Sequence, residues 1–159
     1  MNWYKFVIYF MLFLSALGNI ISAVQHFTGS NITAMIGEPV NIEWIYAVFP
    51  SLRFLLYFCG IASLAMAVLA IITRQWLAHF DKRGITGLLL LYAGTGLISL
   101  IYIIGFMSIF SPALGALGSD EFAAVMGVMI FFAIAIIAGA VLMIVLNRIY
   151  FRKRAHLFH

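Results

Sequence analysis

Long runs of apolar residues alternate with short polar segments along this chain of 159 residues. A helix needs about 20 mostly apolar residues to cross a bilayer, because each residue rises ~1.5 Å through ~30 Å of hydrocarbon. Four runs are about that long, at residues 6–24, 49–73, 85–110 and 122–146. They are continuously apolar rather than alternating and too long for barrel strands. The pattern predicts an all-α integral membrane protein, a bundle of four transmembrane helices.

The segments between the runs are too short to form domains, so a single transmembrane domain over residues 1–159 is expected. The longest is the external loop 25–48. Its last part, Asn41 to Val48, is apolar and aromatic. Two structures are open for it, a short helix at the membrane surface or an extension of the second helix that bends at Pro50. Proline is favoured in the first turn of a helix, which predicts a helix start at Pro50.

Glycine and proline mark the other two connections. Gly84 follows a charged triplet at residues 81–83, and the third helix is expected to begin after it, at Ile85. Pro112 and the glycines behind it predict a loop over residues 111–118.

Charge is scarce and unevenly placed. Charged residues make up 9% of the chain and apolar residues 65%, whereas about a quarter of the residues in soluble domains are charged. This composition excludes a disordered chain, a disulfide scaffold and an ordinary soluble enzyme. Eight of the nine cationic residues lie at the two chain ends and in the second connection: Lys5, Arg74, Lys82, Arg83, Arg148, Arg152, Lys153 and Arg154. Short cytoplasmic loops carry such an excess, so we expect a multi-pass protein of the cell (inner) membrane with both termini in the cytoplasm.

The basic tail, residues 147–159, holds four of these cations, at Arg148, Arg152, Lys153 and Arg154. Each cation contributes about 1 kcal/mol near an anionic membrane surface, so anionic lipid headgroups are the expected partner of the tail. The net charge of +4 does not indicate nucleic acid, because these residues already account for the orientation of the chain.

Patterns for catalysis, metals and cofactors are missing from the sequence. The single cysteine, Cys59, excludes an internal disulfide and a C-x-x-C redox pair. The four histidines lie outside the apolar runs, and no acidic residue lies inside one, which argues against haem ligation and proton-coupled transport. No phosphate-binding loop or hydrolase motif is present. We therefore expect no catalytic residues, no metal and no cofactor.

Two polar residues inside the runs are candidates for a polar pocket or a gate, together with one acid near the second run. Arg53 is the one ionisable group within a run, which by default suggests an anion-binding or gating role. Its long side chain can instead reach the headgroups, or pair with Glu43 or Glu38 of the loop. Asn19 lies deep in the first run.

Small residues recur at helical spacing in all four runs. Such faces mark helix packing in lipid, where association depends on close contact and interhelical hydrogen bonds. The recurring positions are Ser15, Asn19 and Ala23, then Cys59, Ser63 and Ala67, then Thr95 and Ser99, and then Ala135 and Gly139. A polar pocket around Asn19, Ser63, Thr95 and Ser99 requires that these faces converge.

Three patches carry a resemblance that extends over the whole chain. They are W-Y-K-F-V-I-Y-F (Trp3 to Phe10), I-Y-A-V-F-P-S-L (Ile45 to Leu52) and K-R-A-H-L-F (Lys153 to Phe158). With them the chain resembles a loose group of uncharacterised, small four-helix bacterial membrane proteins. The resemblance implies a bacterial source and the same topology, and it implies no activity.

Two functions follow as hypotheses. The first is a non-enzymatic accessory or assembly subunit, whose small-residue faces contact another membrane protein or a second copy of the chain. The second is a small-solute carrier or channel that acts as an oligomer, with Arg53 and Asn19 along the path.

Overall fold

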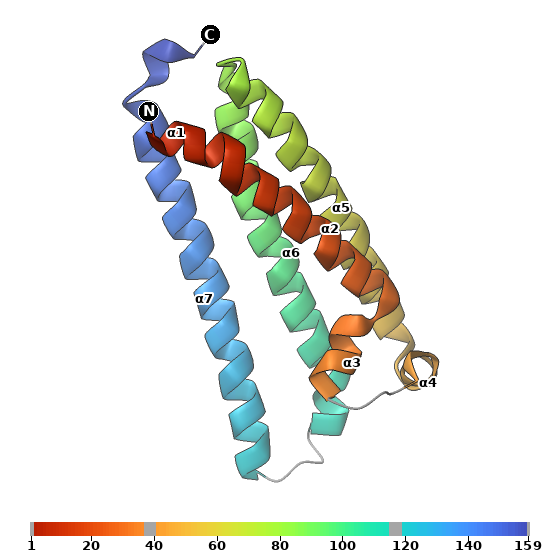
Figure 1. Cartoon of the computed structure of the whole chain (residues 1–159). Coiled ribbons are helices and arrows are strands. Elements are labelled where there is room, and N and C mark those ends of the chain that lie inside the picture. The colour runs from red at the N-terminus through yellow and green to blue at the C-terminus, as the bar shows by residue number, and fades with distance from the viewer. Residues whose placement is uncertain (1, 37–40, 115–118, 159) are drawn as a thin grey trace.

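The protein is a helical bundle. The computed structural model describes residues 2–36, 41–114 and 119–158, of which 94% are helical and none form a strand. Four helices are long and apolar enough to cross a membrane: Trp3–Thr28, Pro50–Ala78, Lys82–Pro112 and Ala123–Arg152. The predicted all-α fold with four such helices is confirmed. The first and last described residues lie at the same end of the bundle (Figure 1), which we call the terminal end.

The first long helix has three parts, α1 (Asn2–Phe6), a π-helical turn η1 (Val7–Met11) and α2 (Leu12–Thr28). The other long helices are α5 (Pro50–Ala78), α6 (Lys82–Leu114) and α7 (Ser119–Arg152). Two short helices, α3 (Ser30–Ile36) and α4 (Ile42–Val48), lie between α2 and α5, and a 3₁₀ turn η2 (Ala155–Leu157) follows α7. Thus every long helix ends beyond its predicted last residue, and all but α5 also begin before the predicted first residue.

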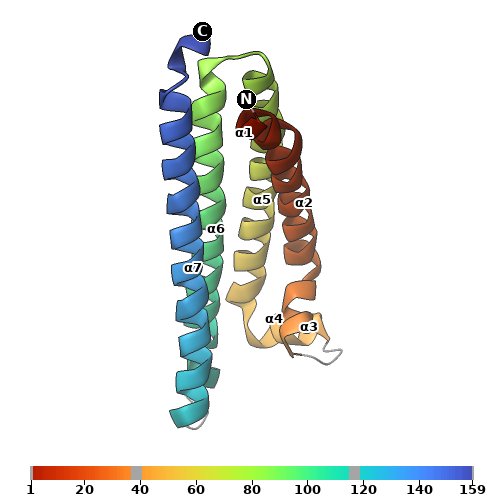
Figure 2. The same cartoon turned by 60° about the vertical axis from the view of Figure 1, so that its left-hand side comes forward.

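Neighbouring helices pack in chain order, α2 on α5, α5 on α6 and α6 on α7. Helix α7 runs beside α6 in both views, and it diverges from α2 with distance from the terminal end (Figures 1 and 2). No side chain between Ala123 and Leu146 is buried, although the structure describes all of these residues. The side of α7 away from α6 is therefore uncovered.

The connection between α5 and α6 is shorter than predicted. Helix α6 begins at Lys82 instead of Ile85, because Asp81 provides the cap: its Oδ1 accepts a hydrogen bond from the Arg83 backbone N at 2.8 Å. Gly84 therefore lies inside the first turn of α6 rather than before it. Phe80 completes the hairpin in a left-handed conformation, at φ 56°.

The predicted loop over residues 111–118 is wrong in its first half. Helix α6 continues through Ser111 and Pro112 to Leu114. Pro112 has no backbone N–H, so α6 lacks one of the last backbone hydrogen bonds before its end. Residues 115–118 lie outside the described residues.

The predicted external loop 25–48 is largely helical. Helix α2 continues to Thr28, and Gly29, at φ 69°, turns the chain into α3. Of the two structures open for Asn41 to Val48, the separate short helix is found, and the Asn41 side chain accepts from the Glu43 backbone N at 3.0 Å at its start. Pro50 is the first residue of α5, as predicted.

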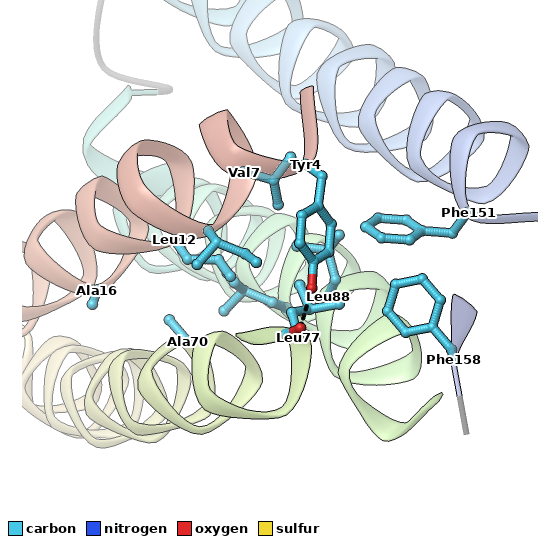
Figure 3. Close-up of a cluster of buried hydrophobic side chains, with 11 residues drawn as sticks. Tyr4, Val7, Leu12, Ala16, Ala70, Leu77, Leu88, Phe151 and Phe158 are labelled. Carbon is cyan, nitrogen blue, oxygen red and sulfur yellow. Dashed lines mark hydrogen bonds between the residues drawn. The ribbon is translucent and has the colours of Figure 1, made fainter. Parts of the chain in front are cut away.

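A hydrophobic cluster closes the terminal end of the bundle (Figure 3). Tyr4 points into this cluster, and its hydroxyl donates a hydrogen bond to the Leu77 carbonyl. The Tyr4 ring lies 6.4 Å from that of Phe151 and 6.2 Å from that of Phe158, between ring centroids. The cluster thus joins α1, α5, α7 and the chain end. We call it the terminal cluster, with buried members Tyr4, Val7, Ile8, Leu12, Ala16, Ala70, Leu77, Leu88, Leu91, Phe151 and Phe158.

The predicted tail 147–159 is therefore only partly a free segment. Helix α7 runs on to Arg152, and Asn147, Phe151 and Phe158 are buried. The hydrophobic run ends at Leu146, but helix α7 continues to Arg152, because Phe151 packs against the rings of Tyr4 and Phe158.

Candidate ligand cavity

A cavity of about 490 Å³ lies between α2, α5, α6 and α7, with Asn31 of α3 also in its wall. Its polar wall comes mainly from α2, α5 and the facing side of α6. Its apolar wall comes from α6 and α7. The lining residues are Asn19, Ser22, Gln25, His26, Asn31, Ser63, Thr95, Ile98, Ser99, Tyr102, Ile103, Phe106, Val128, Met129, Phe132 and Ile136.

Four small or polar residues that the sequence singles out meet in this cavity. Asn19, Ser63, Thr95 and Ser99 all line it, so the faces of three helices converge. Asn19 is buried and its Nδ2 donates to the Ser15 carbonyl at 2.8 Å. The Ser99 hydroxyl donates to the Thr95 carbonyl at 3.0 Å, whereas the buried Thr95 hydroxyl has no hydrogen-bond partner.

The remaining small-residue positions divide between contact and exposure. Cys59 and Ala67 are buried on α5, as a packing face requires. On α7, by contrast, the expected packing residues Ala135 and Gly139 are exposed. The contact with α6 uses Ala140 instead, whose Cβ would lie 3.2 Å from a Cβ added at Gly96.

The structure adds a polar group at one end of the cavity, formed by Tyr102 together with His26 and Asn31, which sequence reasoning did not connect with it. The His26 Nδ1 lies 2.7 Å from the Ser22 carbonyl, and Nε2 is buried without a partner. Asn31 Nδ2 donates to the Tyr102 hydroxyl at 2.9 Å, and the His26 and Tyr102 ring centroids are 5.1 Å apart. The available signal was the spacing of Asn19, Ser22 and His26, which continues one helical face beyond the predicted helix end.

The opposite wall is apolar and incompletely closed. Val128 and Phe132 of α7 line the cavity, yet their side chains are 54% and 53% exposed. Because these two lining side chains are more than half exposed, the α7 wall does not seal the cavity from the surroundings. Among the described residues, no Asp, Glu, Lys or Arg lines the cavity.

Arg53 and Glu43, which the sequence groups with Asn19, lie outside the cavity lining. The Arg53 guanidinium lies over the rings of Tyr46 and Tyr57, with its Cζ 5.7 and 5.8 Å from their centroids. Burial raises the pKa of the Tyr46 hydroxyl, with Tyr57 and Glu43 adding to the rise and Arg53 opposing it. Arg53 is thus part of an aromatic contact between α4 and α5.

This placement gives a first prediction, for Arg53→Gln. A cation–π contact at an exposed site contributes about 0.5–1 kcal/mol, so we expect the free energy of unfolding to fall by about 1 kcal/mol or less. Solute binding in the cavity is expected to stay unchanged. Thermal unfolding and solute binding of the purified variant test both statements. Weaker solute binding would show that Arg53 contributes to the binding site.

The four cations of the tail have two environments. Arg148, Arg152 and Lys153 are exposed at the terminal end, where a surface partner can reach them. Arg154 is half-buried, with its Cζ 4.0 Å from the Tyr150 ring centroid. Within the described part of the chain, no group of three or more His, Cys, Asp or Glu residues is placed to hold a metal ion.

Comparison with known proteins identifies no relative of the chain. No family model, no curated protein and no solved structure matches the chain.

Proposed function

We propose that the chain is a non-enzymatic, multi-pass protein of a bacterial inner membrane that binds a small solute between α2, α5, α6 and α7. The cavity is the observation that supports this proposal. Its volume of about 490 Å³ lies in the range of small-molecule sites, roughly 300–1,000 Å³. Mostly apolar walls with a few convergent polar groups are typical of such sites.

The placement of charge supports an orientation with both termini in the cytoplasm. The eight cations at the chain ends and around the α5–α6 connection belong to the terminal end, where Tyr4, Phe80 and Phe151 pack together. The positive-inside rule assigns that end to the cytoplasm. The exposed Arg148, Arg152 and Lys153 would then face anionic headgroups of the inner leaflet.

The same geometry favours a binding protein or a carrier over an open pore within one chain. The cavity lies away from the terminal end. The terminal cluster fills the part of the bundle between the cavity and that end. Leu77, Leu88 and Leu91 of this cluster are fully buried. A solute that crossed the membrane would need this packed end to rearrange, or a path between copies of the chain.

Native mass spectrometry of the protein, extracted gently from its own membranes, tests the proposal. We expect a small molecule bound at fixed stoichiometry in the wild type, and its loss in Ser99→Phe, which places a ring in the cavity. Ser108→Phe is the matched control, because Ser108 lies on the same helix, makes the same hydrogen bond to the carbonyl four residues before it, and is exposed outside the cavity. A wild type that carries only bulk lipid would contradict a solute site.

The uncovered side of α7 supports a second candidate, an accessory or assembly subunit. A Cβ added at Gly127 or Gly139 would meet nothing within 4 Å. Small residues at such positions allow another helix to approach closely in a membrane. In the same experiment, a different protein at fixed ratio would favour this function. A homo-oligomer with bound solute would favour a carrier.

A further inference from the structure

We infer that the cavity takes an uncharged amphiphile from the lipid phase, whose hydroxyl or N–H head donates a hydrogen bond to Nε2 of His26. This inference rests on the proposed solute site and specifies what that site recognises. Three observations carry it: the unpartnered imidazole nitrogen, the pairing of Tyr102, and the uncharged lining, whose α7 wall is partly exposed.

The hydrogen bonds of His26 define what it offers to a ligand. The side chain is 8% exposed, and its Nδ1 faces the Ser22 carbonyl at 2.7 Å. A carbonyl only accepts, so Nδ1 carries the proton and donates. In the neutral ring Nε2 is then an acceptor, and it is buried without a partner. Buried polar atoms are normally paired, so this nitrogen favours a ligand with a donor group.

Tyr102 supplies the complementary group. Its oxygen accepts from Asn31 Nδ2 at 2.9 Å, which leaves its own proton free to donate. The His26 and Tyr102 ring centroids are 5.1 Å apart, and both side chains line the cavity. A hydroxyl can donate to Nε2 and accept from Tyr102 at the same time. An ether can only accept, so it would leave Nε2 unpaired.

The rest of the cavity excludes a charged ligand and accommodates an apolar tail. No ionisable acid or base other than His26 and Tyr102 is among its described lining residues. An ion in the cavity would therefore lack a counter-charge in the described lining, which is strongly unfavourable within a membrane. Val128, Phe132 and Ile136 of α7 form an apolar wall, in which the Val128 and Phe132 side chains are more than half exposed. The apolar tail of a ligand could lie along this wall and enter the cavity from the lipid.

The test uses the full-length protein in lipid nanodiscs with three matched photoreactive probes. The probes are a medium-chain alcohol, its methyl ether and its trimethylammonium analogue. We expect saturable labelling of α6 and α7 peptides by the alcohol, with about tenfold weaker labelling by the ether, as the loss of one buried hydrogen bond implies. The ammonium probe is expected to give only the non-saturable background labelling of these peptides that any probe dissolved in the bilayer gives.

Variants at two histidines assign the effect to Nε2. In His26→Phe the alcohol should lose its advantage over the ether, whereas His26→Gln, whose side-chain oxygen is an acceptor, should keep part of it. His79→Phe is the matched control: the Nδ1 of His79 lies 2.9 Å from the Gln75 carbonyl in the same way, but the residue is exposed and outside the cavity.

Each contrary outcome overturns a different statement. Equal labelling by alcohol and ether in the wild type would overturn the head-group inference and leave the solute site standing. Stronger labelling by the ammonium probe would overturn the exclusion of charge. A short soluble alcohol that competes as well as the medium-chain alcohol would overturn the lipid source. Saturable labelling by none of the probes, together with no solute in native mass spectrometry, would remove the proposed function itself.

Discussion

Replacing Phe151 with alanine is expected to lower the free energy of unfolding by about 3 kcal/mol. Truncation of a buried Phe typically costs about 3–5 kcal/mol in soluble cores, and the lower end applies here because association of helices in lipid lacks part of the hydrophobic term. Phe151 is 1% exposed, and its ring lies 5.6 Å from that of Phe158 and 6.4 Å from that of Tyr4. It is the main buried apolar contact of α7 in the described structure.

Phe131→Ala is the matched control on the same helix. The Phe131 side chain is 67% exposed, so its truncation should change stability by less than about 0.5 kcal/mol. Unfolding by heat and by denaturing detergent measures both variants under the same conditions. Equal losses would mean that α7 is held along its length instead of at the terminal cluster.

The Phe151 variant also connects stability with the cavity. Helix α7 contributes Val128 and Phe132 to the cavity wall but has its buried anchors, Asn147 and Phe151, near the terminal end. Loosening these anchors should therefore weaken solute binding from a distance. A Phe151→Ala protein that binds solute as tightly as the wild type would show that the α6 contact alone fixes the wall.

The four long helices were predictable because the bilayer allows little else. Backbone groups in hydrocarbon must bond within their own segment, so four long apolar runs leave four helices as the solution. The helix ends were less predictable, because they depend on local contacts rather than hydropathy. Asp81 caps α6 before its apolar run begins, and Phe151 extends α7 after its run has ended.

Four of the sixteen described lining residues of the candidate site were predicted from the sequence: Asn19, Ser63, Thr95 and Ser99. Asn19, Ser63 and Thr95 lie on small-residue faces whose period can be read directly, although only the fold shows that the faces meet. His26 was hidden, because it belongs to a part of α2 beyond the predicted helix end. Tyr102 lies within the predicted third helix, but its partner Asn31 could be identified only from the fold.

The overall shape of the cavity was not predictable. It depends on the divergence of α7 from α2, and α7 is apolar on every side. Its sequence therefore does not specify which face meets α6. The contact that Arg53 makes was not predictable either, because the sequence offered Glu43, Glu38 or the headgroups as its partners, whereas its guanidinium lies over the rings of Tyr46 and Tyr57. Arg53 is the one charge within an apolar run, but it lies within reach of Tyr46, and an aromatic contact accounts for it.

Gly84→Ala is expected to destabilise the bundle by about 2 kcal/mol, within the ~1–3 kcal/mol typical of overpacking. A Cβ at Gly84 would lie 2.8 Å from the backbone N of Leu77 and 2.8 Å from its Cγ. A backbone atom cannot rotate away as a side chain can, so the start of α6 and the end of α5 would have to separate. That movement would disturb Leu77 and, through its carbonyl, the hydrogen bond from Tyr4.

The same substitution at Gly127 should have the opposite sign. Nothing lies within 4 Å of a Cβ added there, and alanine in a helix interior is favoured over glycine by about 0.5–1 kcal/mol. Gly127→Ala should therefore slightly raise the unfolding temperature of the purified protein, while Gly84→Ala lowers it. A Gly84→Ala protein at least as stable as the wild type would contradict the close approach of α5 and α6 at Gly84. A loss of stability in Gly127→Ala would contradict the open space beside Gly127.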